Sequence, residues 1–215
     1  MSEVIKLTAN SEPLVYLAKK DKRLAKLFCM VGDISYRPYE DSYRFLVETI
    51  IGQMLSNKVA NIIRERLLQL CDGQIKPSTI SVLRTDDFRQ IGVSKSKASY
   101  IFSLTEAVLN DIMDFPAFIF MENSEVIKEL TALPGIGPWS AKMYLICVLN
   151  RPDVLPFEDG AFLQSYMWLY KTEDTTSKAV TAKCRKWRPY TSFAARYLYR
   201  ALDNGLTKKP FHLYK

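Results

Sequence analysis

The segment LPGIGPWSA, residues 133–141, decides how this chain of 215 residues folds. Apolar residues at helical spacing lead into it from residue 124 and continue after it to residue 149. Gly135 and Gly137 can adopt the positive φ that a tight turn between helices needs, and Pro138 suits the first turn of a helix. The segment therefore predicts a helix-hairpin-helix motif over residues 124–149.

The hairpin is also a candidate binding site for one phosphate group. The backbone amides of Gly135 and Gly137, together with the positive end of the helix that follows, would point at the same anion. Leu133 and Ile136 would turn inward and hold the hairpin in shape. Because a GxG sequence alone is weak evidence, an ordinary turn between two helices is the alternative.

A second turn has similar features in weaker form. The segment IGVSKSKA, residues 91–98, places Gly92, Ser94, Lys95 and Lys97 beside the start of a predicted helix. The Ser94 hydroxyl can accept a hydrogen bond from an amide of the first turn, and the lysines could contact a phosphate. A plain connection between helices explains this turn equally well.

Positive charge concentrates near the end of the chain. Residues 176–215 contain ten Lys or Arg side chains and a single acidic one, Asp203, so this segment carries net +9 whereas residues 1–175 carry net −2. A one-sided basic segment attracts polyanions and releases counterions from their phosphates. The distribution therefore indicates a nucleic-acid partner, with a solvated basic surface as the alternative.

The composition argues against several other classes of protein. The four cysteines stand singly, without the spacing of a zinc site or an iron–sulfur cluster. His212 is the only histidine, which argues against a Ser-His-Asp triad and a His-rich metal site. No segment approaches the ~18 to 20 apolar residues of a membrane span, and the N-terminal residues lack a signal-peptide pattern. We therefore expect a soluble intracellular protein with reduced thiols and no membrane partner.

Helical periodicity dominates the whole chain, and alternating strand-like runs of any length are missing. The sequence predicts an all-α fold with helices at 13–30, 42–54, 57–71, 78–83, 86–91, 95–110, 124–132, 138–149, 161–170, 177–187 and 191–204. The expected N-caps are the Ser or Thr residues at helix starts, namely Ser42, Ser56, Ser78, Thr85, Ser94, Ser124 and Thr191.

The mixed segment 111–123 is the only candidate joint along the chain. We therefore expect a two-lobed fold with an active-site cleft between the lobes. Lobe A would span about residues 41–112. Lobe B would span about residues 1–40 together with residues 113–215, and it would contain the helix-hairpin-helix.

Four segments, in order along the chain, resemble the helix-hairpin-helix DNA glycosylase superfamily and, within it, the 3-methyladenine DNA glycosylase II branch. They are IIGQMLSNKVA at 50–60, IGVSKSKASYI at 91–101, LPGIGPWSAKMYL at 133–145 with LPFED at 155–159, and KWRPYTSFAARYLY at 186–199. The resemblance extends from about residue 20 to about residue 205. It implies the compact form of the enzyme, because the extra N-terminal β domain of the larger bacterial relative has no counterpart in this sequence.

The resemblance implies base excision, in which a damaged nucleotide is flipped out of the duplex and its N-glycosidic bond is hydrolysed. Asp159 matches the catalytic aspartate of the family, whose carboxylate stabilises oxocarbenium-like charge on the deoxyribose and can orient the attacking water. Without the family, Asp159 would be a plain N-cap. Relatives that also cut the DNA backbone have a lysine where this chain has Trp139, so the resemblance implies a monofunctional glycosylase without lyase activity.

The resemblance also implies a base pocket. Trp139 and Tyr199 match aromatic positions that line this pocket in the family, with core packing as the alternative for both. N-alkylated purines carry positive charge on the ring, which an electron-rich aromatic face attracts. Met143 belongs to the same pocket and departs from the family, because the large bacterial relative has a tyrosine there. The implied substrates are alkylated purines, such as 3-methyladenine and 7-methylguanine, in double-stranded DNA.

The segment GQMLS, residues 52–56, matches the family's loop that enters the minor groove. An apolar side chain from this loop fills the gap that the flipped base leaves. Met54 is the first choice for this wedge and Leu55 the second, and Gln53 would contact the DNA beside them. Without the family, both apolar residues would be assigned to the core at the end of a helix.

The resemblance further implies which ion the protein holds. In relatives, carbonyl oxygens of the hairpin bind a monovalent cation that stabilises the turn and takes no part in the chemistry. The matching carbonyls here belong to Thr131, Leu133 and Ile136. We therefore expect a structural Na⁺ or K⁺, no cofactor for catalysis and no iron–sulfur cluster.

Two other functions stay open at this point. The chain could bind DNA through the hairpin and the basic segment without catalytic activity, because Gly160 follows Asp159 and methionines occupy positions 54 and 143. It could also be a glycosylase for a mismatched or oxidised base, although the lysine and the cluster cysteines of the relatives with those activities are missing. We expect a monomer that acts on DNA in the cytoplasm or nucleoid of a bacterium, or in the nucleus of a eukaryote.

Overall fold

The computed structural model describes residues 3–214, which fold mainly into helices. They divide into two compact units, the first formed by residues up to Pro38 and from Asn150 onward, the second by Tyr39–Leu149. Within the described residues the β structure is limited to one two-stranded antiparallel sheet, so the predicted all-α fold class is confirmed. None of the described helices combines the length and the apolar character that a membrane span requires.

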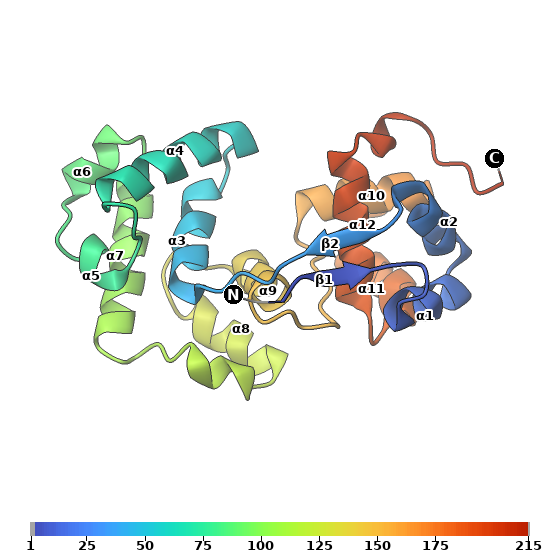
Figure 1. Ribbon diagram of the computed structural model, residues 1–215, viewed down its shortest axis with the longest axis horizontal. Helices are drawn as coiled ribbons and strands as arrows, with labels where there is room; N and C mark the ends of the chain where they lie inside the picture. Colours follow the sequence, from blue (N-terminus) through green and yellow to red (C-terminus); the bar gives the residue numbers. More distant parts are fainter. Residues whose placement is uncertain (1–2, 215) are drawn as a thin grey trace. The chain divides into compact units, whose positions relative to one another are not determined.

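The first unit joins the two ends of the sequence (Figure 1). Its elements are β1 (Ile5–Leu7), α1 (Glu12–Lys20), α2 (Lys22–Val31), β2 (Ile34–Tyr36), α10 (Gly160–Tyr170), α11 (Ser177–Cys184), η2 (Arg185–Trp187), α12 (Thr191–Asp203) and η3 (Leu206–Lys208). The sheet pairs Ile5 with Tyr36 and Leu7 with Ile34. Strands of three residues are too short to show an alternating pattern, which is why the sequence did not predict them.

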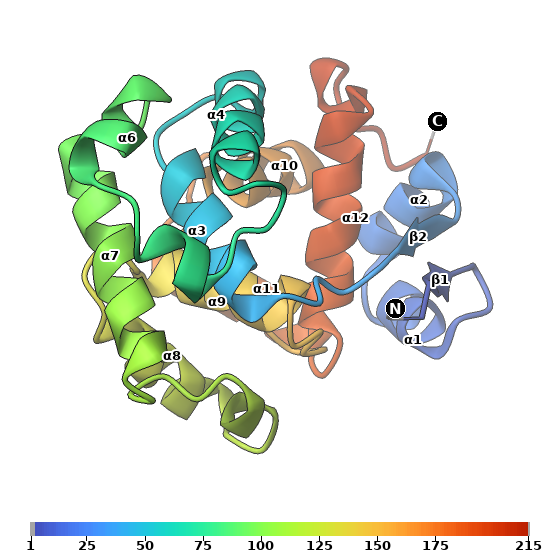
Figure 2. The same ribbon diagram turned by 60° about the vertical axis from the view of Figure 1, so that its left-hand side comes forward.

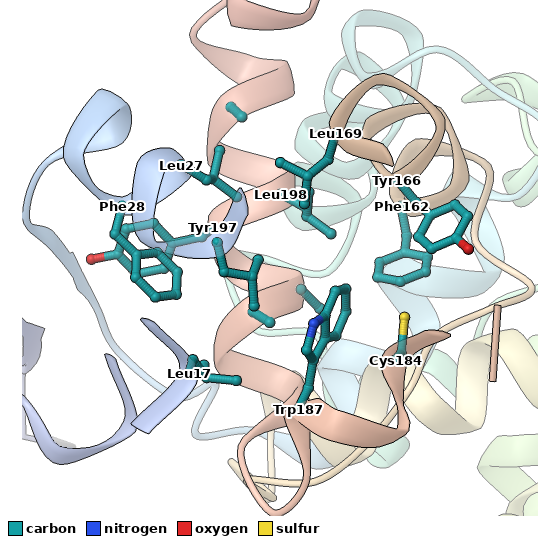
Figure 3. Close-up of a cluster of buried hydrophobic side chains, with 14 of the residues drawn as sticks. Leu17, Leu27, Phe28, Phe162, Tyr166, Leu169, Cys184, Trp187, Tyr197 and Leu198 are labelled. Carbon is teal, nitrogen blue, oxygen red and sulfur yellow. The ribbon is translucent and has the colours of Figure 1, made fainter. Parts of the chain in front are cut away.

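An apolar core surrounds α12 in this unit. Figure 3 shows Tyr197 and Leu198 of α12 between side chains of α1 and α2 and side chains of α10. Phe28 meets Tyr197 edge to face, with ring centroids 4.6 Å apart, and Phe162 of α10 is fully buried. Burying a side chain of this size stabilises the fold by about 1.5–3 kcal/mol. These contacts fix α10, the helix that begins directly after Asp159.

The sequence predicts one helix over residues 13–30, and this prediction is wrong at its centre. The chain forms α1 and α2 instead, separated by Asp21 in an extended conformation with φ −145° and ψ 105°. The Asp21 carboxylate caps α2 by accepting a hydrogen bond from the Arg23 amide at 2.9 Å. The apolar period continues across the break, so periodicity alone cannot reveal it.

The Asp21 carboxylate is only 4% exposed and has further partners from distant parts of the chain. It accepts hydrogen bonds from the Tyr170 hydroxyl and from Trp187 Nε1 at 3.3 Å, and it pairs with Lys186 Nζ at 2.9 Å. Burial alone would raise the pKa of Asp21, but the hydrogen bonds from Tyr170 and Lys186 outweigh it and hold the pKa below its ordinary value. A buried carboxylate needs such partners, and the break between α1 and α2 gives it access to them.

The second unit is helical and contains the helix-hairpin-helix. Its elements are α3 (Ser42–Gly52), α4 (Asn57–Leu70), α5 (Pro77–Ile80), α6 (Thr85–Gln90), α7 (Lys95–Leu109), η1 (Pro116–Ile119), α8 (Asn123–Thr131) and α9 (Pro138–Cys147). Figure 2 shows α3 in the middle of this unit, where it packs against α4, α7 and α9, while α8 packs against α9. The central position of α3 brings the turn after it close to the hairpin.

The hairpin groups with Tyr39–Leu149, whereas the sequence suggested a boundary near residue 113 that would place it in lobe B. The packing of α9 explains the difference. Tyr144 of α9 is fully buried, its ring centroid lies 6.1 Å from that of Phe45 on α3, and its hydroxyl hydrogen-bonds to the Ser42 hydroxyl at 2.7 Å. Burial raises the pKa of Tyr144 to about 12. Contacts between residues about a hundred positions apart decide the grouping, and the local sequence does not display them.

The other predicted helices match the observed ones to within a few residues. Ser56 and Ser94 cap α4 and α7 as predicted. At α3 the cap is Asp41 and not Ser42, because the Asp41 carboxylate accepts the Arg44 amide at 2.8 Å. At α5, α6, α8 and α12 the N-cap position lies one or two residues before the Ser or Thr that the sequence favoured.

Candidate functional site

The two glycines of the hairpin have different conformations. Gly135 has φ +82°, and a Cβ at this position would overlap the Tyr100 ring, so the fold itself requires glycine here. Gly137 is the N-cap of α9 with φ −93° and ψ 178°, which any residue adopts, so the expectation of a positive φ at Gly137 is wrong. A Cβ at Gly137 would meet no atom within 4 Å, and no side chain caps α9. The start of α9 therefore opens outward within this unit.

The hairpin is anchored from inside by Ile136, whose side chain is 3% exposed. The Ile136 amide donates to the Leu133 carbonyl at 3.2 Å, while within residues 3–214 no backbone amide donates to the carbonyls of Thr131 or Ile136. Carbonyl oxygens are the ligands by which proteins replace the hydration shell of K⁺. The carbonyls of Thr131 and Ile136 have no backbone donor among the described residues, which is compatible with the monovalent cation that the resemblance implies. No group of three His, Cys, Asp or Glu side chains suited to a metal ion occurs among the described residues.

The turn between α3 and α4 presents an apolar side chain to solvent. Met54 has φ 58°, in the left-handed region that non-glycine residues rarely adopt, and its side chain is fully exposed at 101%. Leu55 beside it is 37% exposed. Neither residue belongs to the core, which removes the alternative that the sequence left for Met54.

Gln53 ties this turn to the hairpin. Its side-chain Nε2 donates to the Gly135 carbonyl at 2.8 Å and lies 3.4 Å from the Ser140 hydroxyl. The sequence assigned Gln53 to a DNA contact, whereas the structure engages its amide inside the protein. The two turns are therefore mechanically connected within the second unit.

The start of α7 lies against the same turn. Ser94 caps α7 by accepting the Lys97 amide at 3.3 Å, and Lys95 is exposed on the first turn of the helix. Lys97 points the other way: its Nζ donates to the Ile51 carbonyl at 2.8 Å and to the Gln53 carbonyl at 2.6 Å. The sequence placed Lys97 only near a helix start, because nothing in its local pattern shows which distant carbonyls it meets.

Asp159 lies in the first unit, at the start of α10. Its Oδ1 accepts a hydrogen bond from the Phe162 amide at 2.8 Å, so the N-cap role that the sequence offered as an alternative is present. The side chain is 8% exposed. The buried Phe162 holds the helix in place. The Asp159 carboxylate is thus fixed at the start of α10 by its hydrogen bond to a well-packed residue.

The segment before Asp159 is fastened to the start of α12. The Val154 amide donates to the Ser192 hydroxyl at 3.0 Å, and the Ser192 amide donates to the Pro152 carbonyl at 2.9 Å. The Asp153 carboxylate accepts the Thr191 hydroxyl at 2.6 Å. Capping and cross-linking together hold the backbone at Asp159 from both sides.

Tyr199 of α12 borders a hollow of about 150 Å³ in the first unit. The hollow is also lined by Tyr36 of β2 and by Arg196, Arg200 and Asp203 of α12. The Arg196 guanidinium lies 3.7 Å above the Tyr36 ring, a cation–π contact. Tyr199 is half-buried and packs against the apolar core of this unit, so core packing stays the alternative to a role in the base pocket.

Trp139 and Met143 belong to α9 in the second unit. They stand four residues apart, which places them on one face of the helix, and both are half-buried. Lys142 precedes Met143 directly and is therefore rotated from it by about 100° around the helix. The predicted pocket residues thus come from two elements, with Tyr199 on α12 and the other two on α9.

Two cations of the basic segment pair with carboxylates of the protein. Lys186 pairs with Asp21 at 2.9 Å, and Arg188 pairs with Asp153 at 2.7 Å. The net charge of +9 over residues 176–215 therefore includes two side chains that already have an anionic partner. Counting charges along the sequence could not separate these residues from those available to a polyanion.

Comparisons with known proteins agree with this geometry. The family model described as HhH-GPD superfamily base excision DNA repair protein matches residues 47–189. A crystal structure of DNA-3-methyladenine glycosidase from Bacillus halodurans is 30% identical, with a TM-score of 0.84, and covers 97% of both chains. The 3-methyladenine DNA glycosylase of Schizosaccharomyces pombe, solved in complex with abasic DNA, is 27% identical with a TM-score of 0.81, and the match covers 95% of this chain and 100% of that one.

A curated relative extends these matches to a longer protein. The DNA-3-methyladenine glycosylase of Saccharomyces cerevisiae is 33% identical over 79% of this chain, and the match covers 60% of that protein's length. The family match includes the hairpin, the α3–α4 turn and Asp159. The chain belongs to the HhH-GPD superfamily of base excision DNA repair proteins.

Proposed function

We propose that this protein is a monofunctional DNA glycosylase that removes alkylated purines, such as 3-methyladenine and 7-methylguanine, from double-stranded DNA. The observation that carries the proposal is the buried, capped carboxylate of Asp159 in a chain whose relatives are named 3-methyladenine glycosylases. The protein acts as a monomer on cellular DNA and needs no cofactor for catalysis.

Asp159 is the catalytic residue in this proposal. As the bond between base and deoxyribose lengthens, positive charge develops on the sugar, and a fixed carboxylate stabilises that charge. The same carboxylate orients the attacking water and accepts its proton. The hydrogen bond to the Phe162 amide supports this role, since it prevents the side chain from rotating away.

The aromatic residues bind the extruded base. An N-alkylated purine carries positive charge, and stacking against Trp139 and Tyr199 attracts it by on the order of 0.5–2 kcal/mol per contact. Met143, one helical turn from Trp139, adds an adaptable apolar surface. The positive charge also makes the alkylated base a good leaving group, so the enzyme can act on it even if the pocket discriminates only weakly between alkylated and normal bases.

Trp139 also supports the absence of lyase activity. Backbone cleavage by this kind of enzyme starts when a lysine amine forms a Schiff base with the sugar. The indole of tryptophan cannot form this bond. The product of the reaction is therefore an intact strand with an abasic site.

The second unit supplies the contacts to DNA. The open start of α9 at Gly137 binds one phosphate through backbone amides and the helix dipole. Met54 enters the minor groove and fills the gap left by the flipped base. Na⁺ or K⁺ on the carbonyls of Thr131, Leu133 and Ile136 stabilises the hairpin. Ser94 and Lys95 at the start of α7 add a second contact to the phosphate backbone of the DNA.

The test is a chromatographic inventory of bases released from methylated duplex DNA by the purified protein. We expect free 3-methyladenine and 7-methylguanine, with strands that break only after alkali treatment. Strand breaks without alkali, or a protein–DNA adduct trapped by borohydride, would contradict the monofunctional assignment. Tight binding without any released base would indicate a DNA-binding module, and release from mismatched or oxidised DNA alone would indicate a different substrate.

A further inference from the structure

The turn after α3 is held in a conformation that its own side chains do not explain. Met54 is in the left-handed region, with φ 58°, and its side chain is fully exposed. A non-glycine residue persists in this region only where surrounding structure holds it. Because the Met54 side chain gains nothing from core packing, the stabilising contacts must come through the neighbouring backbone.

Lys97 supplies such contacts. Its ammonium group donates to the Ile51 carbonyl at 2.8 Å and to the Gln53 carbonyl at 2.6 Å. These carbonyls lie at the end of α3, where no further turn provides amide partners and where the helix dipole favours a cation. The Gln53 carbonyl belongs to the peptide unit that leads directly into Met54.

The position of Lys97 makes this contact firm. It lies on the first turn of α7, which is capped by Ser94 and packs against α3. The side chain is half-buried, and this burial lowers the pKa of the Lys97 ammonium from its ordinary value. One turn further along α7, the Tyr100 ring covers Gly135 of the hairpin. The same helix start therefore contacts both the α3–α4 turn and the hairpin.

We propose that Lys97 is a positioning residue that holds Met54 ready to enter the DNA, and that it does so through the two carbonyls at the end of α3. The inference rests on the proposed role of Met54 as the wedge. A turn fixed in advance has less freedom to lose on binding, so the wedge binds the gap more tightly. The Gln53 side chain completes the arrangement, because it joins the same turn to the hairpin at Gly135.

The first experiment compares Lys97→Met with Lys95→Met, using duplexes with and without an abasic-site analogue. Methionine keeps the apolar stem of the side chain and removes the donor. We expect K97M to lose on the order of tenfold in affinity for the abasic duplex relative to undamaged duplex, the range for a lost charge-assisted hydrogen bond. K95M removes the same charge from an exposed position and should weaken both duplexes alike. Equal losses on both duplexes for K97M as well would overturn the proposal.

A double-mutant cycle with Met54→Ala decides whether Lys97 acts through the wedge. K97M should cause no additional loss of discrimination once Met54 is gone. Independent, multiplying losses would refute a role through Met54. If M54A lowers discrimination and K97M does not, the wedge stands and the role of Lys97 is wrong. If M54A itself has no effect, the wedge assignment fails, and the positioning role fails with it.

Hydrogen exchange of the free protein tests the mechanism without DNA. The Gln53 and Leu55 amides donate within the turn, at 3.4 Å to Ile50 and 3.2 Å to Gly52. Their exchange should accelerate about tenfold in K97M, because opening of the turn loses a stabilising contact, while amides in the middle of α3 remain unchanged. Lys97→Gln, which is too short to reach both carbonyls, should give the same result. Unchanged exchange at both turn amides would overturn the proposal.

Discussion

Two helix starts, at α9 and at α10, solve the same electrostatic problem in opposite ways. The first amides of any α-helix have no acceptor in the preceding turn and carry partial positive charge. At α10 the chain supplies the negative charge itself, because the Asp159 carboxylate accepts the Phe162 amide at 2.8 Å. At α9 the N-cap is Gly137, which has no side chain, and a Cβ built at this position would have no protein atom within 4 Å.

The difference separates a fixed anion from a place for an external one. The α10 start, FEDG, holds the Asp159 carboxylate against the fold, and in the proposed mechanism this carboxylate stabilises the positive charge on the sugar. The α9 start, GIGP, has no capping side chain and open space at Gly137, which suits the phosphate contact that we propose. We therefore expect the negative charge of Asp159 to affect the rate of base release, and the open space at Gly137 to affect the affinity for DNA.

Asp159→Asn makes the sharpest test of this contrast. Asparagine caps a helix as well as aspartate does, so the free energy of unfolding should change by less than about 1 kcal/mol. The loss of negative charge should slow release of 3-methyladenine on the order of 10³-fold, because the developing positive charge loses its stabilising partner. Single-turnover assays with methylated DNA would measure the rate.

Binding and stability measurements keep the two roles of Asp159 apart. Affinity of D159N for an abasic-site duplex should stay near that of the wild type, and its melting temperature should hold. A parallel fall in stability, affinity and rate would mean that Asp159 is only a cap.

Asp21→Asn provides the matched comparison at a third helix start. Asp21 also caps a helix from a buried position, but its carboxylate is engaged by Tyr170, Trp187 and Lys186. We expect D21N to lower the free energy of unfolding by about 2 kcal/mol at neutral pH through weakened buried hydrogen bonds. The Lys186 pair adds little, because that side chain is 41% exposed. Base release per folded molecule should be unchanged.

The effect of D21N should depend on pH in a defined direction. The folded pKa of Asp21 lies below the ordinary value of 3.8, so ionisation stabilises the fold above that value. This contribution is lost as the pH falls through the folded pKa. Urea unfolding should therefore show a constant gap between wild type and D21N near neutral pH, and a shrinking gap below pH 3.8. A gap that grows in acid would contradict the depressed pKa.

The sequence predicted the local features of this protein better than the distant contacts. Turn chemistry and apolar period located the helices and the hairpin, because both depend on neighbouring residues. The sequence did not predict the helix break at Asp21, because the partners of its carboxylate, Tyr170 and Trp187, lie about 150 positions away. The sequence also did not predict that α9 groups with α3, because this grouping depends on a distant contact between Tyr144 and Ser42.

Within the candidate site, the sequence indicated residue types but not their engagement. Gly135 and Gly137 look alike in the pattern GIG, yet only Gly135 has a positive φ, and only there does the Tyr100 ring fill the space that a Cβ would need. The DNA contact expected of Gln53 stays a prediction, while its side chain donates to the hairpin at 2.8 Å, a contact that the sequence did not indicate. The roles of Asp159, Trp139 and Tyr199 come from the family resemblance and stay predictions.

Gly137→Val tests the open helix start with the smallest expected effect. Valine fits φ −93° and meets no protein atom, so stability should change by about 1 kcal/mol or less. Its methyl groups would occupy the space where a phosphate approaches the amides. Affinity for damaged and undamaged duplex should therefore fall alike, by roughly tenfold, the range for one lost charge-assisted contact. Fluorescence anisotropy at fixed salt would measure it.

Gly135→Ala is the matched control two residues earlier. There the added methyl must adopt φ +82° and displace the Tyr100 ring, so it should lower the melting temperature before it affects binding by folded protein. If G137V left DNA affinity unaltered, the open space at α9 would have no role in phosphate binding, and the contrast with the self-capped start of α10 would describe only local folding. If G137V weakened binding at an unchanged melting temperature, the two glycines would be distinguished by function, one required by the fold and the other by its ligand.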